Sequence, residues 1–378
     1  MSYIKIELVK TKEDLKRFIA VANKPYIDDP NYVIPLMLER LEALQAKTNP
    51  YFEHAEVQYF IATLDGEDVG RISAQIDTLV QENMEAGLGH FGLFEAMSED
   101  AAHMLLNTAE IWLKTRGIKR MQGPWSLSSN QESGLLVDGF DTPPVIMMPH
   151  GRPEYKTWFE SYGFAKEKDL YSYGMEIAAE HSERSARFEQ MARKNKRLKP
   201  RNVDMKNYKA EIDTILDIFN DAWSGNWGYI PMTEHEIDHL AKSLKPIIKK
   251  DRAYIYEVDG KPSAFMITIP DVNHYIAPLK GKLLPFGWAK MVWHLFLSNQ
   301  HPRLRVPLMG VRKEFQKTPL GAAMAISMIE NTRDSVYKKG SRFVEMGWIL
   351  EDNTGMRSMI EMVHGEIYKT YRIYTKDI

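Results

Sequence analysis

The feature that most constrains the fold is an order of predicted elements that occurs twice along the chain. Residues 57–77 read as two β-rich runs around an Asp-Gly turn at Asp65, and residues 252–271 read as two such runs around Asp259. An Asp-Gly pair between two alternating apolar runs is a strong short-range signal for a β-hairpin. Helix patterns precede each hairpin, and strand and helix patterns alternate after it. The chain is therefore predicted to be a mixed α/β protein built as two similar halves.

The other elements follow from residue periodicity and from helix start and stop signals. In the first half we predict strands at 3–9, 89–96 and 118–127, helices at 11–23, 35–46, 98–117 and 152–164, and a closing strand pair at 165–177. In the second half we predict helices at 209–223, 233–244, 320–340 and 354–365, and strands at 303–312, 342–350 and 366–375. We expect two domains, 1–180 and 202–378, joined by a basic linker helix at 181–201.

The composition is that of a globular protein, with 44% hydrophobic and 26% charged residues over 378 positions. This length suits two domains that each bury a core. The net charge of -2 argues against a general nucleic-acid binder. No cysteine is present, so disulfides and thiolate metal sites are excluded. Because the N-terminus lacks a signal-peptide core and no run reaches membrane-spanning length, we expect a cytoplasmic protein.

A basic cluster runs from Arg193 to Arg201 in the expected linker. Binding of single-stranded nucleic acid there would require aromatic residues that stack on bases, and none interleave with the cluster. A solvated linker helix explains these charges more simply. We therefore expect no nucleic-acid partner.

Residues 235–239 read His-Glu-Ile-Asp-His, which matches the H-E-x-x-H pattern of zinc metalloproteases. Thr233 and Glu236 also form a T-x-x-E capping box, which gives the glutamate a structural task. The apolar stripe of this helix leaves both histidines facing solvent or a cleft. No further protease motif follows. We expect a capped amphipathic helix without a metal, whose histidines are secondary candidates for acceptor contacts.

The order of elements in each half resembles the GCN5-related N-acetyltransferase (GNAT) superfamily, here in tandem. The phrase Ser-Tyr-Gly-Phe at residues 161–164 is familiar from those enzymes. The resemblance implies a mixed, mainly antiparallel sheet flanked by helices in each half. It also implies that the strand before the central helix splays from its neighbour and that the following loop binds the pyrophosphate of coenzyme A. Backbone N–H groups and the positive end of a helix dipole stabilise such an anion.

The second half carries an altered form of that loop within residues 309–324. Gln316 and Gly321 match the superfamily pattern, while Pro319 stands where the first glycine belongs and removes one amide donor. Arg312 and Lys317 are expected to supply positive charge. The resemblance thus implies a site for acetyl-CoA or a longer acyl-CoA thioester formed by Met309, Val311, Arg312, Gln316, Lys317, Gly321, Ala322 and Asn353. For Asn353, a helix-capping role is an equally economical reading.

The equivalent segment of the first half carries Glu95, Glu99 and Asp100. Their charges would repel a pyrophosphate, so we expect a degenerate cofactor site in this half.

A narrower resemblance rests on the phrases NPYFEHAE, GRISAQID, GLLVDGFDTPPVIMM, NWGYIPMT and LMGVRKEFQ. They are similar to a bacterial family of double acetyltransferase-like proteins, to which bacterial ceramide synthases are similar. This resemblance implies transfer of a fatty acyl group from a thioester to an amine such as a sphingoid base. The thioester carrier is CoA or an acyl carrier protein.

Acyl transfer to an amine needs a group that takes a proton and donors that stabilise the developing oxyanion. Our candidate bases are Glu345 and Glu351, near the last strands of the second half, together with Glu132 in the first half. The superfamily often uses a tyrosine of the late helix as the acid. The matching positions hold Ile360 and Phe159, so this acid is missing.

Two polar or aromatic segments are candidates for the acceptor site. The long glycine-rich connection at 125–145 is one, because long ordered loops tend to be functional. The connection AWSGNWGYIP at 222–231 is the other. The candidate substrate residues are Asn130, Asp138, Trp223, Asn226, Trp227, Tyr229 and Trp348. Structural roles in the loop or the core explain these residues equally well.

An apolar insertion at 272–302 interrupts the plan of the second half. Residues 279–297 combine aliphatic and aromatic side chains with Lys280, Lys282 and Lys290. This pattern suits contact with a membrane surface or a long acyl chain. A helix buried against the other half or against a second copy explains it equally well.

The function that these patterns favour is acyl-CoA-dependent N-acyltransfer to a small amine. A non-catalytic protein of GNAT fold that binds acyl-CoA or lipid is the alternative, because of Pro319 and the missing tyrosine. A peripheral position at the inner face of the membrane would follow from the insertion.

Overall fold

The computed structural model describes residues 3–178, 180–298 and 300–378. In the first half the strands are β1 (Ile4–Leu8), β2 (Ala55–Leu64), β3 (Glu67–Asp77), β4 (Leu88–Ala96), β5 (Arg120–Gly123), β6 (Trp125–Ser126), β7 (Glu132–Ser133), β8 (Leu135–Asp138) and β9 (Ala165–Glu176). The helices there are α1 (Lys12–Val21), α2 (Met37–Ala43), α3 (Thr78–Asn83), α4 (Glu99–Lys114) and α5 (Glu154–Ser161).

The second half begins with α6 (Glu183–Lys194). Its strands are β10 (Leu198–Asn202), β11 (Ala253–Val258), β12 (Lys261–Pro270), β13 (Arg303–Val311), β14 (Phe343–Leu350) and β15 (Glu366–Asp377). Its other helices are α7 (Tyr208–Trp223), α8 (Glu234–Leu244), α9 (Asn273–Ile276), α10 (Gly287–Val292), α11 (Pro319–Tyr337) and α12 (Thr354–Met362).

One mixed sheet of 13 strands runs through both halves in the order β1-β2-β3-β4-β5-β15-β9-β14-β13-β12-β11-β10, and β8 also pairs with β15. The pairs β4–β5 and β13–β14 are parallel, and the other strand pairs among the described residues are antiparallel. The predicted fold class, a mixed and mainly antiparallel sheet flanked by helices, is confirmed.

Helices cover both faces of the sheet. Alternate residues of β2 pack in different cores, since Phe60 joins the core under α4 and α5 while Ile61 joins the core with α1 and α2. The second half repeats this division. Tyr256 packs in the core with α11, and Ile255 packs in the core with α7. Because successive side chains of a strand point to opposite faces, both faces of the sheet are apolar and are covered by helices. The result is a layer of helices, the sheet, and a second layer of helices.

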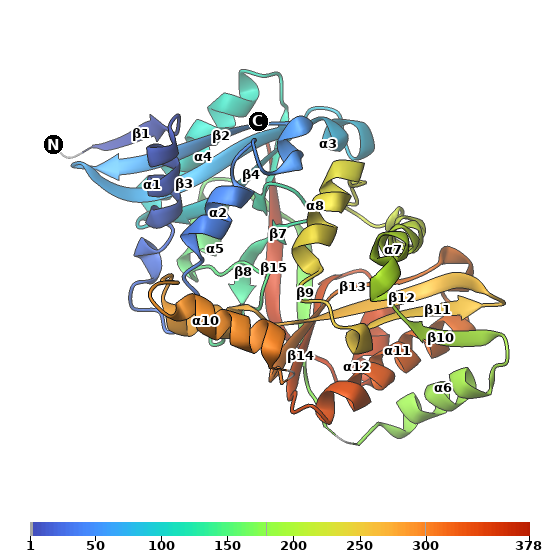
Figure 1. Cartoon of the computed structure of the whole chain (residues 1–378). Coiled ribbons are helices and arrows are strands. Elements are labelled where there is room, and N and C mark those ends of the chain that lie inside the picture. The colour runs from blue at the N-terminus through green and yellow to red at the C-terminus, as the bar shows by residue number, and fades with distance from the viewer. Residues whose placement is uncertain (1–2, 179, 299) are drawn as a thin grey trace.

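The two halves exchange their last strands at the centre of the sheet. β15 lies between β5 and β9, and β9 lies between β15 and β14 (Figure 1). Each half is therefore completed by a strand that belongs to the other half in sequence. The domain boundaries at 180 and 202 remain predictions.

Some local predictions were wrong. Residues 165–177 were expected to form two strands, and residues 165–176 form one strand, β9. The linker 181–201 was expected to be a helix throughout, but α6 ends at Lys194 and β10 extends the sheet. Several charges of the basic cluster are engaged in ion pairs within the protein. Arg201 contacts Glu211 and Glu257, and its pairing explains why a basic segment can join a sheet edge.

Candidate functional site

β13 and β14 run together over their first residues and then part. Their parallel pairing ends at Val306 opposite Met346. The register of β12 and β13 shifts here, and β13 continues along β12 to Val311 while β14 continues along β9. A gap between the two strands therefore opens beside residues 307–311, where the GNAT resemblance implies a splay.

Met309 and Val311 present backbone groups at this gap. The indole N–H of Trp223 donates to the carbonyl oxygen of Met309 over 3.1 Å, and Nε2 of Gln316 donates to that of Val311 over 2.9 Å. Because the N–H and C=O of one strand residue point to the same edge, the N–H groups of Met309 and Val311 also face away from β12. Such an edge suits an extended ligand that carries amides.

The loop between β13 and α11, residues 312–318, lies at the N-terminus of a long helix. Thr318 caps α11 by accepting from the N–H of Gly321 at 3.1 Å. A Cβ on Gly321 would overlap the carbonyl oxygen of Phe315, so a glycine is needed where the helix meets the loop. Pro319 occupies the first helical position, which proline favours. Because proline has no N–H, the loop still has one donor fewer for a ligand. The N–H of Ala322 is used within the helix start, where it donates to the carbonyl oxygen of Thr318.

The predicted cations of this loop differ in availability. Arg312 donates to the carbonyl oxygen of Pro262 at 2.7 Å and forms an ion pair with Asp217. Lys317 lies in the left-handed region at φ 59° and has no ion-pair partner among the described residues. Lys317 is therefore the cation of the predicted set that is left for an anionic ligand.

The corresponding place in the first half has a different construction. Two residues, Met97 and Ser98, connect β4 to α4, whereas 312–318 connect β13 to α11. After β5 the chain turns back through Trp125, and a Cβ on Gly92 of β4 would overlap the backbone carbonyl of Trp125. The chain itself therefore fills the gap between β4 and β5. Of the acidic residues expected to repel a pyrophosphate, Glu95 is buried and accepts from Tyr26 and Tyr155.

Aromatic side chains line the approach to the second-half gap. The rings of Trp223 and Trp348 lie 6.4 Å apart, and that of Trp227 stacks on Trp125 of the first half at 6.0 Å. Tyr229 donates to Asn220 over 2.8 Å. Three of the predicted substrate residues, Trp223, Trp227 and Trp348, thus gather where the halves meet. Asn226 lies in the same connection, where its backbone N–H donates to Trp223.

Glu345 of β14 is fully buried beneath a first-half loop. Its carboxylate accepts a hydrogen bond from Tyr368 of β15 and lies 3.5 Å from Nε of Arg305. Burial raises the pKa of Glu345, against the opposing effects of Arg305 and Tyr368. Since Val344 and Met346 pack under α11, Glu345 faces the opposite side of the sheet.

The loop that covers Glu345 is clamped by buried charges. Lys369 donates to the carbonyl oxygens of Gly139 and Thr142, and Arg305 donates to that of Ile146. Burial lowers the pKa of Lys369 to about 8. The sequence analysis did not single out Tyr368, Lys369 or Arg305. The pairing of β15 with β8 and β9 brings Tyr368 and Lys369 to this loop, and the pairing of β13 with β14 places Arg305 beside Glu345.

The other candidate bases and polar contacts lie elsewhere. Glu351 accepts from Lys166 at 2.7 Å near the start of β9, and Glu132 accepts from Arg40 at 2.7 Å. Asn130 donates to the carbonyl oxygen of Ile230 at 3.4 Å and thereby links the halves. The carboxylate of Asp138 is exposed. The side chain of Asn353 caps α12 by accepting from the N–H of Met356.

The H-E-x-x-H segment forms the start of α8. Glu236 accepts from the backbone N–H of Thr233 at 2.8 Å, so the predicted capping box is present. The carboxylate of Glu236 also lies 3.4 Å from His54 of the first half, which Asp77 contacts at 2.9 Å. Burial lowers the pKa of His54, but these two carboxylates outweigh burial and raise it to about 9. His235 is largely exposed beside Glu53.

Residues around α8 leave an open polar pocket of about 260 Å³ between the halves, lined by residues that include His235, His239 and Lys242. Within the described ranges, no group of three histidine or acidic residues could hold a metal ion.

Several large apolar side chains of the insertion are exposed, although Leu295 is buried in the core with α7. Leu284, Phe286, Trp293 and Leu297 are 78%, 72%, 59% and 67% exposed. The segment before α10 approaches the first half at Ile34, and α10 lies on that side of the molecule (Figure 1). Across the described residues, no helix combines the length and the apolar character that crossing a membrane requires.

Comparison with solved structures agrees with this architecture. The chain is similar to a tandem GNAT protein from the clavulanic acid biosynthesis pathway, with a TM-score of 0.59 and 8% identity, over 99% of this chain and 98% of that one. It is also similar to a GCN5-related N-acetyltransferase from Sphaerobacter thermophilus, with a TM-score of 0.53 and 11% identity, over 99% and 95% of the two chains. The protein therefore has a tandem GNAT fold.

Proteins with similar sequences identify the family to which the chain belongs. A protein named bacterial ceramide synthase from Caulobacter vibrioides is 44% identical over 375 residues, covering 97% of this chain and 96% of the relative. Protein YghO from Escherichia coli is 43% identical, covering 98% and 95%. No protein-family model matches the chain. The chain belongs to the family of these two proteins.

Proposed function

We propose that the chain is an N-acyltransferase that moves an acyl group from a CoA thioester, held in the gap between β13 and β14, to the amine of a small acceptor. The name of the Caulobacter relative supports a long acyl chain and a sphingoid base. Acceptors of this kind would approach from the side of Trp223, Trp227 and Trp348, where apolar rings meet.

The observation that carries this proposal is the difference between the halves. The second half combines a strand edge whose N–H groups at Met309 and Val311 face away from β12, a seven-residue loop with Lys317 and the N-terminus of α11. The first half has a two-residue connection and a gap filled by Trp125. Helix N-termini and unpaired amides bind phosphates, which supports a cofactor site in the second half.

The chemistry requires an amine lone pair to attack the thioester carbonyl carbon. The C–N bond forms, the C–S bond breaks, the thiolate leaves as CoA, and one amine proton must be removed. Glu345 is our candidate base and Tyr368 its positioning partner, because burial raises the pKa of Glu345 and thus its affinity for a proton. Ile360, at the superfamily's tyrosine position, is buried and supplies no acid.

Calorimetry with CoA, acetyl-CoA and palmitoyl-CoA tests the donor site, and mass spectrometry of a sphingoid base incubated with palmitoyl-CoA tests transfer. Binding with amide formation supports the proposal. Binding without turnover, for every amine and for both CoA and acyl-carrier-protein thioesters, favours the alternative of a non-catalytic binding protein. No binding of any thioester contradicts both the acyltransferase and a non-catalytic protein that binds acyl-CoA.

The exposed apolar side chains of residues 279–297 support a second part of the proposal, contact with an anionic membrane surface at the inner face. Lys280, Lys282 and Lys290 flank them, and an apolar face with cationic flanks inserts at such a surface. Vesicle sedimentation tests this. Phe286→Ser with Trp293→Ser should reduce binding to anionic vesicles, whereas Met191→Ser, at an exposed apolar position on α6, should not. Equal binding by all three proteins would contradict the membrane contact.

A further inference from the structure

The outer face of α6 and the residues just after it carry exposed cations. Along one side of the helix, at positions i, i+3, i+7 and i+10, lie Arg184, Arg187, Met191 and Lys194. Lys196 and Lys199 are exposed just beyond its end. We refer to these residues as the α6 stripe. Its cations have no ion-pair or hydrogen-bond partner among the described residues.

The stability of α6 does not explain the α6 stripe. Like charges about one turn apart on a helix destabilise it slightly. Other cations of this region do have partners within the protein, since Arg193 pairs with Glu189 and Arg197 pairs with Asp259. The α6 stripe is therefore available to an anionic partner outside the protein.

The α6 stripe ends beside the candidate donor loop, residues 312–318. Arg197, which follows α6, contacts Asp259 in the turn between β11 and β12 at 2.6 Å. Lys261, on the other side of the same turn, contacts Glu314 of the loop at 3.4 Å. A partner bound along the α6 stripe would therefore lie next to the loop.

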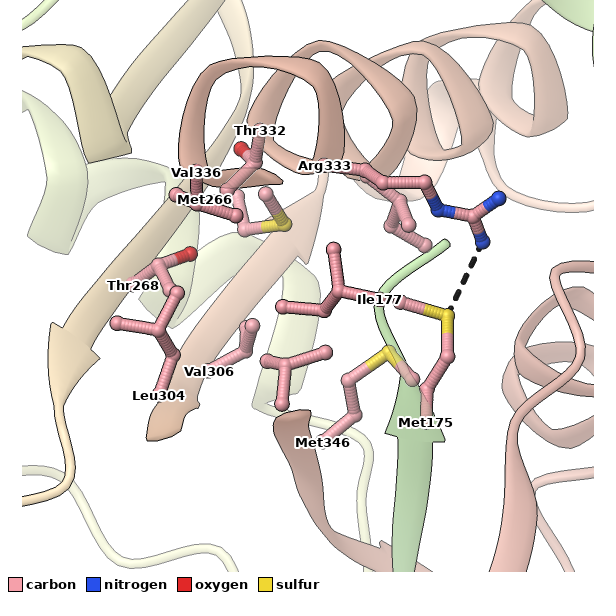
Figure 2. Close-up of a pocket in the computed structure, with 12 residues that line it drawn as sticks. Met175, Ile177, Met266, Thr268, Leu304, Val306, Thr332, Arg333, Val336 and Met346 are labelled. Carbon is pink, nitrogen blue, oxygen red and sulfur yellow. Dashed lines mark hydrogen bonds between the residues drawn. The ribbon is translucent and has the colours of Figure 1, made fainter. Parts of the chain in front are cut away.

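The start of α6 is anchored to α11, the helix that begins at this loop. Arg333 of α11 donates to the carbonyl oxygen of Glu180, just before α6, at 3.3 Å. It also donates to the sulfur of Met175 at 3.1 Å, the contact dashed in Figure 2. His181 contacts Asp334 at 2.9 Å. Because these contacts hold the start of α6 near the end of α11, the two helices run antiparallel, and the last turn of α6 lies toward the N-terminus of α11 (Figure 1).

The composition of the α6 stripe favours a protein partner. Arginine and methionine are enriched where proteins meet, and Met191 is 44% exposed within the stripe. Among the described residues of α6, no other large apolar side chain is exposed, whereas insertion into a membrane surface needs an apolar face. The positive charge of the stripe is complementary to an acidic protein surface.

The donor loop itself suits a ligand with a single phosphate. Pro319 removes one amide donor, and Lys317 lacks an ion-pair partner among the described residues. CoA carries a pyrophosphate and a further phosphate on its ribose. On a carrier protein, the same pantetheine arm is joined to a serine by one phosphodiester. Both thioesters would place pantetheine in the gap, but the carrier form needs fewer donors from the loop.

We propose that the α6 stripe docks an acidic carrier protein that bears the acyl group as a pantetheine thioester, and that its arm enters the gap between β13 and β14 beside the loop 312–318. This inference rests on the proposed function, since it assumes a pantetheine thioester in the gap. The amine attacks the same carbonyl carbon, the C–N bond forms and the C–S bond breaks. The pantetheine thiol stays on the carrier and receives the proton that the amine loses.

The test measures steady-state transfer to a sphingoid base from palmitoyl-CoA and from the palmitoyl form of an acidic bacterial acyl carrier protein. Arg187→Glu with Lys194→Glu should raise KM for the carrier about tenfold, because charge complementarity is lost, and leave KM for palmitoyl-CoA unchanged. In calorimetry, the same variant and Met191→Ser should bind the carrier more weakly. Lys156→Glu with Lys209→Glu is the matched control and should change neither KM, since both lysines are exposed on other helices and lack ion-pair partners among the described residues.

The outcomes separate this inference from the proposed function. If the wild type binds neither thioester, the proposed function itself is contradicted, and this inference with it. If palmitoyl-CoA is bound but the carrier is not, or the carrier is bound equally well by the variant of Arg187 and Lys194, only the docking assignment is wrong. Equal loss of carrier binding in the control variant would also overturn it. Loss of binding to anionic vesicles with unchanged carrier binding would assign the α6 stripe to a membrane surface instead. Thermal unfolding of each variant confirms that it is folded.

Discussion

Gly321 offers a sharp perturbation of the proposed donor site. A Cβ at this position would lie well under 3.0 Å from the backbone carbonyl oxygen of Phe315, whereas ordinary contact begins at 3.4 Å. The neighbour is backbone and cannot rotate away, so Gly321→Ala must displace the loop 312–318 from α11 by roughly 1 Å. Overpacking of this kind typically costs about 1–3 kcal/mol of stability.

The displacement should weaken CoA binding more than it weakens the fold. Loss of one or two hydrogen bonds to a charged phosphate, at about 1.5–3 kcal/mol each, corresponds to a decrease in affinity of at least tenfold. Calorimetry with CoA measures the decrease in affinity, and thermal unfolding measures the loss of stability. Gly355→Ala is the control, since Gly355 lies near the start of α12 and a Cβ there would have its nearest neighbour at 4.0 Å. Wild-type CoA affinity in a folded Gly321→Ala protein would refute the assignment of the loop.

Three further predictions concern other parts of the molecule. Because the pKa of His54 is raised to about 9 from 6.5, the stability that its charged form contributes is complete below about pH 6.5 and is lost as the pH rises through 9. In urea unfolding, the free energy of unfolding should fall by an amount on the order of 1–3 kcal/mol over this pH range, and His54→Gln should remove this fall. An unchanged fall in that variant would exclude His54 as its source. Tyr368→Phe should lower kcat about 10- to 100-fold with thioester affinity unchanged, as measured by steady-state kinetics and calorimetry, and an unaltered kcat would remove the Glu345–Tyr368 pair from the mechanism. Deletion of residues 279–297 should abolish use of long acyl donors while circular dichroism shows the fold retained, and an unchanged chain-length preference in a folded deletion would show that the insertion serves another purpose.

Much of the fold was predictable because its signals are local. The two Asp-Gly turns form the predicted hairpins β2–β3 and β11–β12, and capping residues such as Ser98 and Thr233 start helices where expected. The exchange of β9 and β15 was not predictable, since strand partners far apart in sequence leave no local pattern. β10 was missed for the same reason: its basic residues are explained only by partners such as Glu257.

The candidate donor site was predicted from residue spacing, and its role in binding CoA stays a prediction. Gln316 and Gly321 are identified by their spacing. The structure places Gln316 in the loop between β13 and α11 and Gly321 in the first turn of α11. The sequence could not show that the chain fills the gap between β4 and β5. That gap is filled because the backbone of Trp125 lies close to Gly92, and these two residues are far apart in sequence. It also could not show that Glu345 lies under a loop from the other half, because Lys369 and Arg305 hold that loop through backbone carbonyls.

The most direct test of the central claim is a crystal structure of the protein soaked with CoA. We predict density for one CoA per chain, with the pyrophosphate at residues 316–321 and the pantetheine along Met309 and Val311. Density in the first half between β4 and β5, or none at saturating CoA, would contradict the account.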